Sequence, residues 1–167
     1  MGIYLFDSDN FIDNHTTWRF HFNHISRPTP LQITSALAAI ANGGTLYQPH
    51  LVLGTEPRTI RDHVVSKESI EEVQKGMRRT VIAGTARTLQ EVPVPVAAKT
   101  GTAQVSSGLP HAWVTAYAPY EHPEIVMTVM VEHAGEGATV AAPIMRDILT
   151  SYFESGRAQK AEPFFTP

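Results

Sequence analysis

The stretch Val96–Val105 reads V-A-A-K-T-G-T-A-Q-V, and the rest of the chain is organised around it. Small and β-branched residues dominate the stretch, which favours an extended strand over a helix. Side chains alternate along a strand, so Thr100 and Thr102 are expected on one face and Lys99 on the other, with Gly101. Two hydroxyls near an ammonium that reaches around the strand edge can hold a carboxylate. The stretch therefore predicts an anion-binding strand.

Further strands and a closing helix are predicted after this stretch. Ala112–Ala118 and Ile125–Glu132 are apolar and β-branched, and the segment Pro119–Pro123 between them indicates a β-hairpin with a longer loop. Thr139–Phe153 has the apolar spacing of a helix. Its expected buried stripe is Ile144, Ile148, Leu149 and Tyr152. We expect this helix to cover an antiparallel sheet of at least three strands.

Two helices are predicted ahead of the central stretch. Thr29–Gln32 is a capping box with proline at the first helical position, and the run Asn42–Gly44 ends that helix. Ser66 caps the second helix, and Gly84 follows its end. The expected buried stripe of the second helix is Ile70, Val73, Met77 and Val81. Leu46–Leu53 reads as a short irregular strand because it contains a proline.

The fold class that follows is α/β of the α+β type, an antiparallel β-sheet flanked by helices. The Lys-Thr-Gly triplet at Lys99–Gly101, followed by Thr102–Gln104 and by His111–Trp113, resembles the third active-site motif of penicillin-binding proteins and β-lactamases. The segment Thr29–Gly44 resembles the helix that precedes this motif in class B peptidoglycan D,D-transpeptidases of the elongation type. The resemblance implies a partial penicillin-binding/β-lactamase-like transpeptidase fold. Residues 28–155 would be the C-terminal half of the domain, residues 1–27 an unmatched N-terminal segment and residues 156–167 a tail.

The resemblance also implies a role for each matched residue. Lys99 would polarise the site. Thr100 and Thr102, with Gly101 between them, would bind the terminal carboxylate of a D-Ala-D-Ala stem peptide or of a β-lactam. The backbone N–H of Thr102 would be half of an oxyanion hole. The implied activity is cell-wall cross-linking by serine-type acyl transfer, with no cofactor.

The other two motifs of that family are weak or missing. Ser8 and Asn10 belong to a Ser-Asp-Asn triplet that fits the second motif, although turns and helix starts have the same composition. No serine in the sequence is followed by lysine three positions later, so the Ser-x-x-Lys nucleophile is absent from it. We therefore expect the chain to be inactive alone and to need the N-terminal half of the domain as its partner.

The composition of the chain limits the number of domains and the kinds of partner that we expect. The chain has 167 residues, 43% of them apolar and 17% charged, which suits one globular domain. A net charge of −3 with scattered histidines argues against nucleic acid. His15, His21 and His24 lack a completing carboxylate or cysteine, so no metal site is predicted.

The sequence shows no export signal or anchor, since no run approaches 18 apolar residues and Met1–Arg27 lacks the features of a signal peptide. The resemblance nevertheless implies the extracytoplasmic (periplasmic) face of the cell membrane, beside other cell-wall elongation proteins. We therefore expect a piece of a longer protein or a truncated copy.

Two alternative functions stay open. A non-catalytic remnant that binds a peptide or a partner would also keep the third motif without the first. A different serine hydrolase would use Ser106 or Ser107 with His111, but the sequence has no Gly-x-Ser-x-Gly elbow and no defined acid for it.

Overall fold

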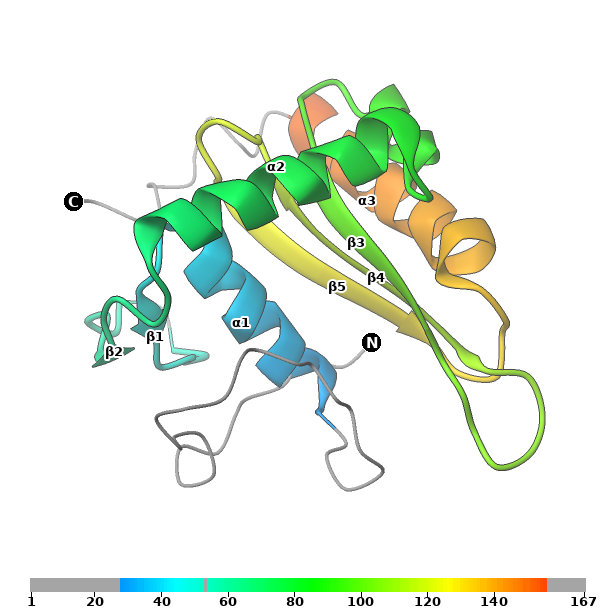
Figure 1. Cartoon of the computed structure of the whole chain (residues 1–167), viewed down its shortest axis with the longest axis horizontal. Helices are drawn as coiled ribbons and strands as arrows, with labels where there is room; N and C mark the ends of the chain where they lie inside the picture. The colour runs from blue at the N-terminus through cyan, green and yellow to red at the C-terminus, as the bar shows by residue number, and fades with distance from the viewer. Residues whose placement is uncertain (1–27, 53, 156–167) are drawn as a thin grey trace.

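The computed structural model describes residues 28–52 and 54–155. Its centre is an antiparallel sheet whose strands are, in spatial order, β3 (Ala97–Ala103), β4 (His111–Ala118) and β5 (Ile125–Val131). Gly101 on β3 pairs with Trp113 on β4, and Trp113 pairs in turn with Met130 on β5. The predicted hairpin and three-stranded sheet are confirmed. Figure 1 shows the three strands running side by side through the middle of the molecule.

Helices lie on both sides of this sheet (Figure 1). They are α1 (Pro30–Ala41), α2 (Lys67–Ala83) and α3 (Ala142–Glu154). The 3-10 turn η2 (Arg87–Glu91) follows α2, and the π-helical turn η3 (Gly137–Ala141) precedes α3. One face of the sheet packs on α3, η2 and the last turn of α2, and the other packs on α1. A separate two-stranded sheet is formed by β1 (Leu46–Tyr47) and β2 (Thr59–Arg61).

Alternate residues of β4 enter two different hydrophobic cores. One core holds the even-numbered residues of β4, together with Val129 of β5 and Met145 and Leu149 of α3. The other core holds Tyr117 of β4 together with Leu37 of α1. Because both faces are covered, β4 is apolar at almost every position, unlike a strand with one wet face.

The predicted helix ends are confirmed by their caps. The N–H of Thr29 donates to Oε1 of Gln32 at 2.8 Å, which is half of the predicted capping box. Ser66 Oγ accepts from the N–H of Ser69 at 3.3 Å at the start of α2, and Gly84 is the C-cap of that helix. These local signals therefore fixed where α1 and α2 begin and end.

The predicted buried stripes of α2 and α3 each contain one residue that is exposed. Val73 is 45% exposed, and Gln74 takes its inward place by donating to the carbonyl of Ile40 at 2.8 Å. Ile144 is 40% exposed, whereas Met145 is fully buried. The remaining predicted positions are buried or partly buried, among them Ile70, Met77 and Val81 of α2 and Leu149 of α3.

Two predicted element bounds also need correction. The helix predicted from Thr139 is split, because Pro143 has no N–H for a bond to the Thr139 carbonyl, and the residues before it form the π-helical turn η3. The strand predicted over Leu46–Leu53 is two residues long and ends before Pro49. Its partner β2 was not predicted, since Thr59–Arg61 is exposed throughout and has no apolar alternation.

Candidate active site

Lys99 lies on β3, which is an edge strand of the described sheet. The Lys99 side chain is exposed, and its backbone pairs with Thr115 of β4. Its Nζ atom donates to the carbonyl oxygen of Thr100 at 2.5 Å. The ammonium therefore does reach around the strand, as the sequence led us to expect, and lies at the edge of the sheet.

The backbone at this edge offers a hydrogen-bond donor beside the ammonium. Antiparallel pairing uses the N–H and C=O groups of every second residue, and the carbonyl of Thr100 is held by Lys99. The N–H of Thr102, two residues further along, points to the same side. Thr102 is exposed, so this N–H and the hydroxyl of its side chain lie near the surface.

The side chain of Thr100 lies on the opposite face from Lys99, as predicted from strand alternation. Its Oγ1 atom is 2.6 Å from Oγ1 of Thr85, in the loop that follows α2. Thr85 is a residue that the sequence gave no reason to select, because nothing local to it signals a contact with β3.

Glycines allow a close approach of backbones at the motif. A Cβ built on Gly101 would be 3.3 Å from Cβ of Trp113. A Cβ built on Gly137, in η3, would be 2.5 Å from the carbonyl oxygen of Gly101 and would collide with the carbonyl oxygen of Trp113. Turn η3 therefore rests its backbone directly on the pair of strands that carries the motif.

A chain of hydroxyls supports the sheet on the Lys99 face. Thr34 of α1 donates to Oγ1 of Thr128 at 2.7 Å, and Thr128 is bonded to Oγ1 of Thr115 at 2.8 Å. Thr128 is 2% exposed, so its hydroxyl depends on these partners for hydrogen bonds. Thr115 is the strand partner of Lys99. These hydroxyl contacts therefore connect α1 to the sheet next to the Lys-Thr-Gly motif.

Two histidines contact each other where the β3–β4 loop ends and β4 begins. The N–H of His133 donates to Nδ1 of His111 at 3.0 Å, and the two rings pack edge to face with centroids 4.8 Å apart. In the described residues, no hydrogen bond joins Ser106 or Ser107 to His111. The serine hydrolase alternative therefore gains no geometric support.

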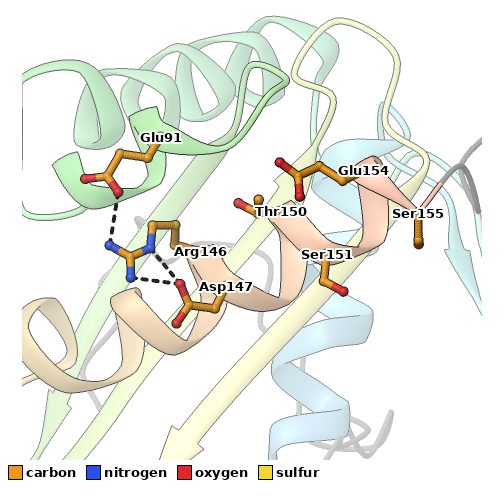
Figure 2. A pocket seen from close by; sticks show the side chains of 7 residues that line it. All are labelled: Glu91, Arg146, Asp147, Thr150, Ser151, Glu154 and Ser155. Carbon is orange, nitrogen blue, oxygen red and sulfur yellow. Dashed lines mark hydrogen bonds and ion pairs between the residues drawn. The ribbon is translucent and has the colours of Figure 1, made fainter.

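One cavity in the described residues is remote from the motif strand. It has a volume of about 710 Å³ and lies between η2 and α3. Figure 2 shows Arg146 between Glu91 at 3.1 Å and Asp147 at 2.8 Å in this cavity. The hydrogen bond to Asp147, followed by the charges of Asp147 and Glu91, raises the pKa of Arg146. The cavity is polar and shares no residue with β3.

Some predictions fall outside the described residues, including the second-motif candidates Ser8 and Asn10. Within residues 28–52 and 54–155, no three His, Asp or Glu side chains gather as a metal site would require. Over the same ranges, no helix combines the length and the apolar character needed to cross a membrane.

A family model and curated relatives both match most of this chain. Residues 26–150 match the family described as the penicillin binding protein transpeptidase domain. The chain is 33% identical to the peptidoglycan D,D-transpeptidase MrdA of Haemophilus influenzae, in an alignment covering 83% of this chain and 26% of that protein. The chain thus spans about a quarter of the length of this curated relative.

Solved structures resemble the fold described above. One is penicillin-binding protein 2 of Helicobacter pylori in a complex with MreC, with a TM-score of 0.68 and 30% identity over 78% of this chain and 25% of that one. Another is penicillin-binding protein A of Mycobacterium tuberculosis as an imipenem acyl-enzyme, with a TM-score of 0.67 and 29% identity over 77% of this chain and 32% of that one.

Proposed function

Because the chain belongs to the penicillin-binding protein transpeptidase domain family, we propose that it forms the carboxylate-binding part of a peptidoglycan D,D-transpeptidase domain. Residues 28–155 make up the C-terminal half of that domain in this proposal. The nucleophilic serine and its lysine then belong to the N-terminal half, since no Ser-x-x-Lys occurs in this sequence.

The observation that carries the proposal is the position of the Lys99 ammonium at the outer edge of β3, on the carbonyl of Thr100. In the proposal this ammonium attracts the terminal carboxylate of a D-Ala-D-Ala stem peptide. The hydroxyls of Thr100 and Thr102 donate hydrogen bonds to the same carboxylate. An extended peptide fits along such an edge, because an unpaired strand edge offers backbone donors and acceptors.

The N–H of Thr102 has a second role in the proposal. When a serine attacks the peptide carbonyl, negative charge develops on its oxygen, and a fixed backbone N–H at the strand edge stabilises that charge. Gly101 keeps this part of the edge free of a side chain, so the reacting carbonyl can approach the backbone. A β-lactam has the same carboxylate next to a reactive carbonyl, so we propose that it binds the same way.

The proposal also covers the cellular location of the whole protein and its protein partner. We propose that it works at the extracytoplasmic face of the cell membrane, where peptidoglycan is cross-linked. The complex of the Helicobacter pylori relative with MreC supports a cell-wall elongation protein as a further partner. A non-catalytic remnant of the fold would bind the same peptide without reacting with it.

Titration of the isotope-labelled chain with diacetyl-Lys-D-Ala-D-Ala, followed by amide NMR shifts, tests carboxylate binding. We expect the largest shifts at Lys99, Thr100 and Thr102, and weaker binding at high salt, because exposed charges are screened. The same peptide with a C-terminal amide is the matched control and should cause no comparable shifts. Equal shifts with both peptides, or shifts confined to other strands, would contradict the proposal.

A further inference from the structure

A hydroxyl from outside the motif strand meets Thr100. Oγ1 of Thr85 lies 2.6 Å from Oγ1 of Thr100, although the two residues are fifteen positions apart. Thr85 is exposed and Thr100 is partly exposed, so the pair lies where a ligand along the β3 edge can reach it. In the described part of the chain, Thr85 is the one residue outside β3 whose side chain forms a hydrogen bond to a side chain of the Lys-Thr-Gly triplet.

The chain around Thr85 is held firmly in this place. The N–H groups of Gly84 and Ala86 both donate to the carbonyl of Thr80 at 3.1 Å. A Cβ on Gly84 would be 2.8 Å from Cα of Thr80, so the turn leaves no room for a side chain there. Ala86 is fully buried in the core under the sheet. Thr85 is thus fixed between a tight turn and a buried anchor.

Counting protons shows what the pair can do. Each threonine hydroxyl has one proton, so only one of the two oxygens donates across the 2.6 Å contact. If Thr100 donates to Thr85, its proton is not available to an anion at the β3 edge. If Thr85 donates, the Thr100 proton is free, and a carboxylate, which only accepts, selects this arrangement. Hydroxyls linked in this order also polarise each other.

We propose that Thr85 is a positioning residue for Thr100, whose hydroxyl it holds as an acceptor so that the Thr100 proton points to the substrate carboxylate. The inference rests on the proposed function and deepens it, because it adds a residue from another element to the carboxylate site. Thr85 acts through Thr100 and needs no contact of its own with the ligand.

A double-mutant cycle on the 167-residue chain tests this role. The dissociation constant of diacetyl-Lys-D-Ala-D-Ala is measured by amide NMR for Thr85→Val, Thr100→Val and the double variant. Thr85→Val keeps the shape of the side chain and removes the hydroxyl, and we expect it to weaken binding about three- to tenfold, as loss of one hydrogen bond does. In the Thr100→Val background the same change should have no further effect.

Two control variants separate positioning from folding. Thr85→Ser retains the hydroxyl and should bind within about twofold of the wild type. Thr80→Val removes a hydroxyl five residues away that bonds only to the carbonyl of Gly76, and it should leave binding unchanged. Thermal melts of all variants show whether any loss of binding follows a loss of stability.

The outcomes distinguish the inference from the function on which it rests. If the wild-type chain shows no carboxylate-dependent shifts, both fail. If the wild type binds but Thr85→Val binds equally well, only the inference fails. Additive losses in the double variant would also overturn it, since they would mean that Thr85 acts independently of Thr100.

Discussion

Lys99 is a residue whose charge we expect to matter to a ligand and hardly at all to folding. Its side chain is exposed and donates a hydrogen bond to the carbonyl of Thr100. Lys99→Ala should change the free energy of unfolding by less than about 0.5 kcal/mol, as exposed substitutions do. It should weaken binding of diacetyl-Lys-D-Ala-D-Ala by about tenfold or more, because a charge-assisted hydrogen bond is lost.

Lys75→Ala is the matched control for that change. Lys75 is also exposed, and it pairs with Glu72 at 2.6 Å on the outer face of α2. Its removal should affect neither stability nor peptide binding measurably. Equal losses of affinity in both variants would mean that the peptide responds to net charge and not to the β3 edge.

Gly137 is a residue where even one methyl group should be costly. Its backbone rests on the carbonyl oxygens of Gly101 and Trp113, so Gly137→Ala forces η3 away from the strands. We expect a loss of about 1–3 kcal/mol in urea unfolding, the usual cost of overpacking. Gly76→Ala, on α2 with no atom within 4 Å of the added Cβ, should instead gain about 0.5–1 kcal/mol. Similar effects of the two changes would refute the close packing of η3.

At the scale of single residues, the sequence predicted the local geometry of the candidate site only where residues adjacent in the sequence determine it. Strand alternation correctly separated Lys99 from Thr100 and Thr102, because that geometry is local. Thr85 and Gly137 were missed, since their contacts join residues far apart in the chain and leave no local pattern. Ser8 and Asn10 stay untested predictions.

The element that closes the sheet is α3, and its two sides should respond differently to truncation. Leu149 is 1% exposed and packs in the core with Val114 and Val129, whereas Ile144 is 40% exposed. Leu149→Ala should lower the free energy of unfolding by about 2–5 kcal/mol through loss of burial and a residual cavity. Ile144→Ala should cost less than about 1 kcal/mol. The reverse order in urea unfolding would contradict the orientation of α3.

Strand β4 places a phenol in the second core, which should make stability sensitive to alkali. Tyr117 is fully buried, and burial raises the pKa of its hydroxyl well above the ordinary value. A free tyrosine titrates at about pH 10. The preference of the fold for the neutral phenol is therefore complete below that pH and is lost as the pH rises beyond it.

Tyr117→Phe tests this element directly. The hydroxyl has no partner among the described residues, so its removal should be neutral or stabilising at pH 7. Melting temperatures measured from pH 8 to 11 should fall less steeply for the variant than for the wild type. Parallel curves would show that Tyr117 does not contribute to alkaline unfolding.

Elements were predicted well where a short sequence signal fixes them and poorly where tertiary packing decides. The cap at Ser66 and the hairpin of β4 and β5 follow from local residue preferences. Val73 of α2 and Ile144 of α3 were wrongly assigned to the buried faces, because Gln74 finds a backbone partner inside and Met145 fits the space under the sheet. The hydrophobicity of the sequence predicts neither the hydrogen bond of Gln74 nor the packing of Met145.

At the scale of the whole molecule, the sequence predicts binding without acylation. No serine has a lysine three positions later, so a hydroxyl of ordinary acidity has no base to activate it. The purified 167-residue chain incubated with a fluorescent penicillin should show no covalent adduct on denaturing electrophoresis or by intact mass. Haemophilus influenzae MrdA under the same conditions is the comparison protein. An adduct on any serine of this chain would disprove the expectation and would bring Ser8 back as a candidate.

Strand β5 has a consequence for handling the protein. Its sequence I-V-M-T-V-M-V has no charge, no proline and no glycine, and in the described part of the chain it pairs only with β4. An uncharged strand with a free edge is a template for further strands, and segments of this kind drive aggregation. Concentrated stocks of the chain should therefore lose solubility by strand addition at β5. Light scattering should rise steeply with protein concentration at temperatures well below the melting temperature.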